Sequence, residues 1–273
     1  MMKVLIIGAG NMGMTYGQGI VNANVVRPSH VWVMDKSEEK RAVVSRISTN
    51  PMFTEPGAFV GEVDLIILSV KPQDFSLLAE GIKAYLKPTQ LVLSIMAGVG
   101  MKDIIRYLGV PKIIRAMPNL PAQVGRGMTV FTTSAEVSTK EILDAQNLLN
   151  TTGKTLYTEE ESMVDAATAI SGSGPAFVFY YMQAMIEGAE RMGFSEAEAL
   201  LLVEQTFAGS LQLFQHHNLT CKDWISRVSS RGGTTEAAMK SFGVHHVNTL
   251  IEQGLEEARK RAIELSKEVG NKT

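Results

Sequence analysis

Short continuous runs of apolar residues recur through the first 155 residues of the chain. Such runs are typical of strands buried on both faces of a parallel sheet, because these strands have no solvent-facing side to show as alternating polar positions. The runs are Val4–Ile7, Val31–Met34, Leu65–Leu68, Leu91–Leu93, Lys112–Ile114 and Met128–Thr132.

Amphipathic segments lie between several of these runs and predict helices over Gly13–Ala23, Ser37–Ile47, Asp74–Leu86 and Glu136–Asn150. Strands that alternate with helices in this way form a doubly wound α/β sheet. The pattern therefore predicts an N-terminal Rossmann-type domain over residues 1–158.

The pattern changes after about Glu160, where no further strand-like run stands out. Helical patterns cover Met163–Ala169, Pro175–Met192, Glu196–His216 and Val244–Glu268, and Ser195 is placed as the N-cap of the third. The apolar faces of the third and the last of these helices exceed what one small domain buries. We therefore predict an all-α domain over residues 159–273 that forms a homodimer.

A glycine-rich turn joins the first predicted strand to the first predicted helix, with the sequence Gly8-Ala9-Gly10-Asn11-Met12-Gly13. In this arrangement Gly8 makes the tight turn, Gly10 lets the backbone approach a pyrophosphate, and Gly13 lets the helix pack closely on the strand. The helix N-terminus then presents unpaired N–H groups to the phosphates. The context predicts a dinucleotide site.

An acidic residue, Asp35, ends the second predicted strand, 22 residues beyond Gly13. That spacing suits a carboxylate that binds the ribose 2′-hydroxyl of NADH and would repel the 2′-phosphate of NADPH. Lys36 and Ser37 follow directly and are candidates to bind that phosphate, or else a solvated charge and a helix cap. These residues favour NADH and leave NADPH open.

Composition and charge exclude several classes of binding partner and of covalent cross-link. A net charge of −2 gives no basic field for nucleic acid or an anionic membrane, and the single cysteine, Cys221, excludes an intrachain disulfide. The first apolar run is too short for a leader peptide and meets glycines instead of a cleavage site, and no run reaches the ~20 residues of a membrane helix. We expect a soluble, cytoplasmic protein.

Two further loops follow predicted strands, where an open α/β sheet binds its ligand. One contains Val70, Lys71 and Pro72, with Lys71 a candidate to neutralise cofactor charge, and the other contains Ala97 and Gly98. The five histidines form no metal-ligand pattern and offer no obvious proton-transfer base. The missing ligand pattern argues against a metal site. The missing base favours a substrate that brings its own proton, such as an imine.

The densest polar stretch without an assigned role is Ser229-Ser230-Arg231-Gly232-Gly233-Thr234-Thr235-Glu236. Its glycines permit a sharp turn, and Thr234 or Thr235 then starts a helix whose N–H groups suit a carboxylate. A threonine hydroxyl both donates and accepts, so it can hold an imine nitrogen. A plain capping turn between two helices is the competing interpretation.

This stretch resembles the Ser-Pro-Gly-Gly-Thr-Thr-like loop of pyrroline-5-carboxylate reductases. Arg115–Ala122 (RAMPNLPA) and Ile170–Ala176 (ISGSGPA) are similar to two other segments of that family, and the glycine turn and the Val70–Pro72 loop also fit. The resemblance runs in order over about residues 3 to 265.

The resemblance implies reduction of L-1-pyrroline-5-carboxylate to L-proline with NADH or NADPH, the last step of proline synthesis, by a homodimer often joined into larger rings. It implies that the N–H groups of Gly233 and Thr234, with Ser230, hold the substrate carboxylate in a loop that also contains Gly232. The Thr235 hydroxyl would meet the ring nitrogen, and Ala97, Gly98 and Asn119 would line the nicotinamide.

One departure is Arg231, where the family usually has proline, which loosens the loop and adds a charge. Two other functions compete. A β-hydroxyacid dehydrogenase is expected to carry a lysine on the first helix of its second domain, and Pro175–Met192 has none. The second is a protein that binds the cofactor without turnover. The intact Gly232–Thr235 loop, with the Thr235 hydroxyl, argues against it.

Overall fold

The computed structural model describes residues 2–270, the side chains of 266–270 excepted. Its chain divides into two compact units, Met1–Ser173 with Glu257–Thr273, and Gly174–Glu256. The predicted boundary after residue 158 falls inside the first unit, where the next helix packs on the sheet. That this boundary separates a cofactor-binding segment from a dimerising segment stays a prediction.

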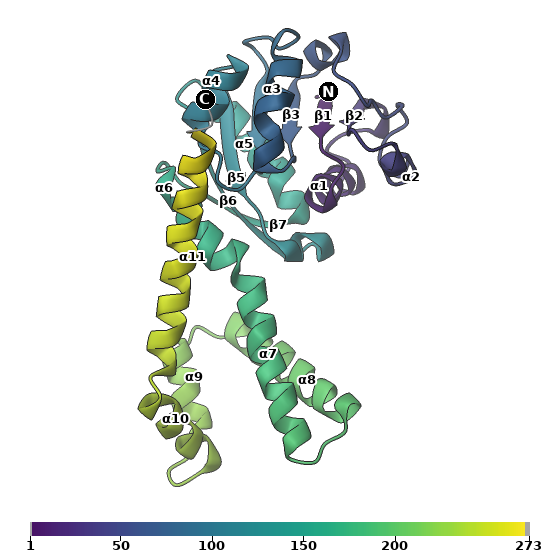
Figure 1. The fold of residues 1–273 in the computed structure, drawn as a ribbon. Helices are drawn as coiled ribbons and strands as arrows, with labels where there is room; N and C mark the ends of the chain where they lie inside the picture. Colours follow the sequence, from purple (N-terminus) through teal and green to yellow (C-terminus); the bar gives the residue numbers. More distant parts are fainter. Residues whose placement is uncertain (1, 271–273) are drawn as a thin grey trace. The chain divides into compact units, whose positions relative to one another are not determined.

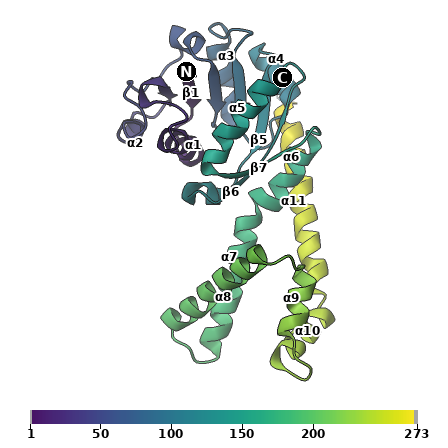
Figure 2. The ribbon, with the colours of Figure 1, turned by 180° about the vertical axis from the view of Figure 1, so that it is seen from behind.

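The first unit is built on a seven-stranded sheet of order β2-β1-β3-β4-β5-β6-β7 (Figures 1 and 2). Strands β1 to β5 are parallel, β6 runs antiparallel to β5, and β7 is parallel to β6. The strands are β1 Val4–Ile7, β2 Val31–Met34, β3 Leu65–Leu68, β4 Leu91–Ser94, β5 Ile113–Met117, β6 Gly127–Thr133 and β7 Gly153–Tyr157.

Helices cover both faces of this sheet, and successive residues of each strand serve the two faces in turn. Val4 and Ile6 of β1 pack in one core with side chains of α1 and α5, whereas Leu5 and Ile7 pack in a second core with α3 and α4. The helices are α1 Asn11–Asn22, α2 Arg41–Val44, α3 Phe75–Lys83, α4 Met101–Leu108, α5 Thr139–Leu149 and α6 Ser162–Ala167. The predicted doubly wound sheet is confirmed.

The second unit is helical. It contains α7 Gly174–Arg191, α8 Glu196–His216, α9 Cys221–Val228 and α10 Thr234–Val244, and α11 Val247–Gly270 begins in it. Ser195 caps α8 as predicted, because its hydroxyl accepts the Glu198 N–H while the Glu198 carboxylate accepts the Ser195 N–H. The helices α7 and α8 pack against each other, with the Tyr181 and Phe207 rings 5.9 Å apart.

Several predicted elements differ from the observed ones. The helix expected over Ser37–Ile47 is reduced to a 3₁₀ turn, Glu38–Lys40, and the four residues of α2. The strand β7 and the helices α4 and α9 were not predicted. In the described part of the chain, no group of histidine, cysteine, aspartate and glutamate side chains is arranged to hold a metal ion, and no helix is long and apolar enough to cross a membrane.

Candidate cofactor and substrate site

The predicted cofactor residues gather at one edge of the sheet. Strands β1, β3, β4 and β5 are parallel, so their carboxyl ends meet at the same edge. In the strand order, β2 lies on one side of β1 and β3 lies on the other, so the chain changes direction across the sheet at β1. The gap between β1 and β3 is therefore the switch point where such sheets bind ligands. The loops that contain Gly8–Gly13, Val70–Pro72, Ala97–Gly98 and Asn119 all follow these strands.

The glycine turn has the backbone that its sequence predicted. Gly8 adopts a φ of 102°, and a Cβ there would lie 2.5 Å from the carbonyl oxygen of Ser69. A Cβ on Gly13 would lie 2.2 Å from the Gly8 carbonyl oxygen. Only glycine fits both positions without moving backbone.

Gly10 differs from its two neighbours, because a Cβ there would meet nothing within 4 Å. Gly10 is also the N-cap of α1, and no described side chain caps that helix. The open side of Gly10 and the uncapped first turn therefore leave room and N–H donors for a phosphate. This arrangement fits the pyrophosphate of a dinucleotide.

The first helix is fixed to the sheet just beyond the turn. The Tyr16 hydroxyl is buried and lies 2.8 Å from Thr129 Oγ1 of β6. Burial raises the pKa of Tyr16, against a smaller opposing effect of its hydrogen bonds to Thr129 and Thr152. Tyr16 therefore stays neutral and acts as an anchor for α1.

Asp35, at the end of β2, is tied to the glycine turn. Its carboxylate accepts the N–H of Ala9 at 2.6 Å and the N–H of Ser37 at 2.8 Å. Lys36 lies beside it with 82 % of its side chain exposed, and its Nζ is 3.4 Å from Asp74 Oδ1. The charge nearest to Ala9 of the glycine turn is thus the carboxylate, with the lysine directed to Asp74.

The other two loops are held in different ways. Lys71 is exposed and directly precedes a 3₁₀ turn that starts at Pro72. Gly98 takes a φ of 68° in the loop after β4. The Asn119 amide is engaged on both sides, since Nδ2 donates to the Ser171 carbonyl at 3.0 Å and Oδ1 accepts the Met128 N–H at 2.9 Å. Contact of these residues with the nicotinamide stays a prediction.

A groove of about 610 Å³ runs along α1 on the first unit. It includes Asn11 of the glycine turn and continues past Gln18 to Asn22, opposite Gln123 and Thr151. The predicted cofactor residues Asp35, Lys71 and Gly98 lie outside it. The groove therefore shares Asn11 with the predicted cofactor site and does not include these three residues.

The predicted substrate loop lies in the second unit, between α9 and α10. Gly232 takes a φ of 72°, and the Gly233 N–H donates to the Ser230 carbonyl at 2.9 Å. Thr234 and Thr235 are the first two residues of α10, and Gly233 stands at its N-cap with no side-chain hydrogen bond. The N–H groups of Thr234 and Thr235 therefore lie in a first turn that has no intrahelical partners for them.

Glu236 belongs to the same polar stretch, and the sequence predicted no role for it. Its Oε2 accepts the Gly232 N–H at 2.6 Å, which closes the turn. A glutamate in the first turn of a helix, soon after a glycine pair, was the available signal. The Gly232 N–H is thus bound internally, as is that of Gly233, one of the two N–H groups expected to hold the carboxylate, and those of Thr234 and Thr235 remain for a ligand.

Comparisons with known proteins agree with both halves of this geometry. Residues 161–265 match the family model described as pyrroline-5-carboxylate reductase dimerisation, and residues 3–98 match the one described as NADP oxidoreductase, coenzyme F420-dependent. The chain is 35 % identical to a pyrroline-5-carboxylate reductase of Pseudomonas aeruginosa over 98 % of both chains. It is 32 % identical to a second such protein of Bacillus subtilis, over 98 % of this chain and 96 % of that one.

Solved structures give the same result. A pyrroline-5-carboxylate reductase from Coxiella burnetii superposes with a TM-score of 0.88 at 30 % identity, over 97 % of this chain and 98 % of that one. The pyrroline carboxylate reductase of Plasmodium falciparum, solved with NADP bound, gives 0.87 at 25 % identity with the same coverage.

Proposed function

This chain belongs to the pyrroline-5-carboxylate reductase family, and from that premise we propose that it reduces L-1-pyrroline-5-carboxylate to L-proline with NADH or NADPH, the final step of proline biosynthesis. The observation that carries the proposal is the full-length relationship to the Pseudomonas aeruginosa protein. It is supported by an intact glycine turn in the first unit and an intact Gly-Gly-Thr-Thr loop in the second.

The reaction adds a hydride to the imine carbon and a proton to the ring nitrogen, and the bound cofactor supplies the hydride. The glycine turn and the first turn of α1 would hold the pyrophosphate, and Asp35 the ribose. Val70, Lys71, Pro72, Ala97, Gly98 and Asn119 would border the nicotinamide half.

On the substrate side, the N–H of Thr234, with Ser230, would bind the carboxylate, and the Gly233 N–H would exchange its bond to the Ser230 carbonyl for the ligand. Gly232 and its bond to Glu236 would fix the shape of the loop. The Thr235 hydroxyl would bind the ring nitrogen and help deliver its proton, which is the one catalytic role that we assign.

The test is the absorbance of the reduced nicotinamide in the presence of purified protein and pyrroline-5-carboxylate, with NADH and NADPH in parallel. We expect loss of absorbance that depends on the imine. Protein that binds the cofactor and leaves it unoxidised would instead support the interpretation as a binding protein without turnover.

The preference between the two cofactors rests on Asp35. We expect Asp35→Asn to raise the ratio of kcat/KM for NADPH to that for NADH by about tenfold, because it removes a charge that repels the 2′-phosphate. Asparagine keeps only one of the two oxygens that accept the N–H groups of Ala9 and Ser37, so one of these bonds is lost, and the resulting distortion of the turn should affect both cofactors alike. An unchanged ratio in parallel kinetics would show that Asp35 does not face the 2′ position.

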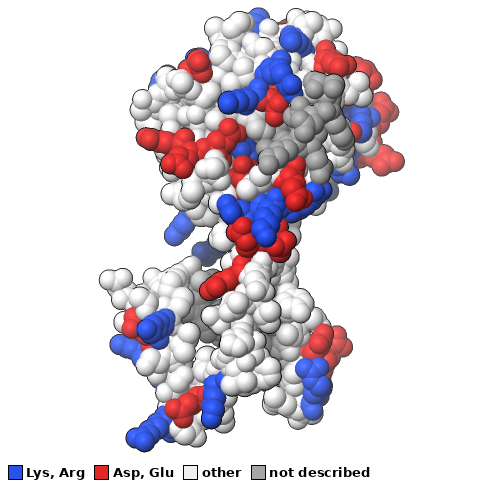
Figure 3. Space-filling model, turned by 60° about the vertical axis from the view of Figure 1, so that its left-hand side comes forward, with Lys and Arg blue, Asp and Glu red and all other residues white. Residues whose placement is uncertain are grey.

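We also propose that the helical unit forms the homodimer, and that dimers join into a larger assembly in the cytoplasm. The helix α7 has no buried residue, and its Phe179 and Tyr180 are 61 % and 80 % exposed. Uncharged residues cover much of this unit on the face in Figure 3. Apolar surface of this extent is typical of a protein–protein interface.

Light scattering should therefore give a mass at least twice the 29.7 kDa of one chain. We expect Tyr180→Glu to lower the mass, because a buried unpaired charge is unfavourable at an interface. Leu77→Glu on α3 is the matched control, since Leu77 is 76 % exposed in the other unit. A monomeric wild-type protein would exclude the dimer.

A further inference from the structure

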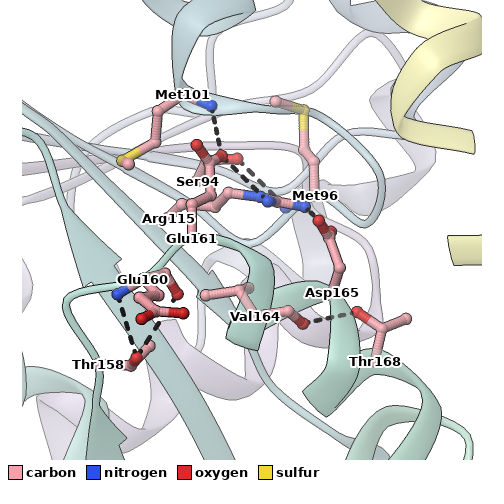
Figure 4. A network of polar contacts seen from close by, with 10 residues as sticks. All are labelled: Ser94, Met96, Met101, Arg115, Thr158, Glu160, Glu161, Val164, Asp165 and Thr168. Atoms are coloured by element: carbon pink, nitrogen blue, oxygen red, sulfur yellow. Dashed lines mark hydrogen bonds and ion pairs between the residues drawn. The ribbon is translucent and has the colours of Figure 1, made fainter. Parts of the chain in front are cut away.

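A buried arginine in the sheet carries contacts that neither the cofactor nor the substrate site uses. Arg115 lies on β5 between Ser94 of β4 and Thr132 of β6, and its side chain is 2 % exposed. Its Nη1 is 3.0 Å from Glu161 Oε1 and its Nη2 is 2.5 Å from Asp165 Oδ1 (Figure 4). A buried guanidinium needs such partners, so this cluster fixes α6 on the sheet.

Glu161 has a second contact that Asp165 lacks. Its Oε1 also accepts the Met101 N–H at 2.7 Å, as Figure 4 shows. Met101 is the first residue of α4, and the N-cap of that helix, Gly100, offers no side chain. A carboxylate 60 residues along the chain therefore caps α4.

The end of α4 that Glu161 caps adjoins the proposed nicotinamide side. Met101 directly follows the loop that contains Ala97 and Gly98. The residues after β5 are tied to the same region, because Asn119 donates to the Ser171 carbonyl. Both loops are thus fastened to residues 161–171, where the match to the dimerisation family model begins.

We propose that Glu161 is a positioning residue for hydride transfer, which holds the Ala97–Gly98 loop through the Met101 N–H and is itself held by Arg115. The inference rests on the proposed function, since it concerns the placing of the nicotinamide against the imine. A cluster that served stability alone would give Glu161 and Asp165 equal importance for turnover. The Met101 contact distinguishes the two carboxylates.

The experiment compares Glu161→Ala, Glu161→Gln and Asp165→Asn in the full-length protein. Glutamine keeps an oxygen that accepts the Met101 N–H, whereas alanine removes it. We expect Glu161→Ala to lower kcat about tenfold, with KM for the imine changed less than about threefold, because the loop no longer fixes the nicotinamide. Glu161→Gln should restore kcat to within about threefold of wild type.

Asp165→Asn is the matched control, since Asp165 binds Arg115 and makes no bond to α4 among the described residues. It should lower the melting temperature as Glu161→Gln does and leave kcat within about twofold of wild type. Equal loss of kcat in Asp165→Asn and Glu161→Ala, or unchanged kcat in Glu161→Ala, would overturn the proposal.

Amide hydrogen exchange at Met101 gives a result that does not depend on activity. Exchange should be faster in Glu161→Ala than in wild type, Glu161→Gln or Asp165→Asn. If the wild-type protein does not reduce the imine, that result counts against the proposed function. Unchanged exchange in Glu161→Ala would count against the Glu161 contact itself.

Discussion

Replacing Thr235 by alanine should lower kcat by about 10²-fold, the lower end of what a positioned proton donor contributes. The substitution removes the hydroxyl that we place at the ring nitrogen and leaves the N–H of the first turn of α10 intact. Affinity for the reduced cofactor should change less than about threefold, because the predicted cofactor residues lie in the other unit. Steady-state kinetics and a fluorescence titration of the cofactor measure the two quantities.

The neighbouring threonine supplies the control for this prediction. Thr234 acts through its N–H, so Thr234→Ala should keep kcat within about threefold of wild type, and Thr235→Ser should recover most of the lost activity. Circular dichroism would confirm that α10 is formed in each variant. Full activity in Thr235→Ala would exclude the proton role.

Gly13→Ala should weaken cofactor binding by at least about 10²-fold, or ~2.7 kcal/mol. The added methyl would lie 2.2 Å from the Gly8 carbonyl oxygen and 3.0 Å from Ser69 Oγ. The turn must therefore shift, and overpacking of this kind lowers the free energy of unfolding by about 1–3 kcal/mol. Cofactor titration and denaturant unfolding report the two effects.

Gly10→Ala separates binding from stability. A methyl there meets no atom within 4 Å and the backbone φ is −76°, so the free energy of unfolding should change by less than about 1 kcal/mol. The same methyl projects into the space that we assign to the pyrophosphate, so cofactor affinity should still fall. Wild-type affinity in Gly10→Ala would place the cofactor elsewhere.

The buried strands of the sheet were predictable because their sequences are continuously apolar. Val4–Ile7, Val31–Met34 and Leu65–Leu68 match the observed strands residue for residue. The edge strand β7 was missed because Lys154, Leu156 and Tyr157 are exposed, so its sequence, GKTLY, lacks an apolar run. Its pairing with β6 is a tertiary contact that local pattern does not encode.

Short helices were the other omission. The helix α4 has only eight residues, yet Gly109, with a φ of 72° at its C-cap, was a usable end signal. The predicted helix after Ser37 was too long, because a 3₁₀ turn replaces its first residues and the chain leaves the helix after Val44.

In the candidate site, the sequence predicted residues whose roles follow from local backbone. The glycine turn and the start of α10 at Thr234 are of this kind. The partners of Arg115 were not predictable, since Glu161 and Asp165 lie 46 and 50 residues away along the chain. A charged residue within an apolar strand was the one available signal that a buried ion pair exists.

A deuterium label on the nicotinamide follows the transferred hydride from the cofactor to the product. The protein would be incubated with pyrroline-5-carboxylate and NADH or NADPH deuterated at the transferred position of the nicotinamide, and the product analysed by mass spectrometry and NMR. We expect L-proline that carries one deuterium at the former imine carbon. Bound cofactor that remains reduced, with no labelled proline from either nucleotide, would contradict it.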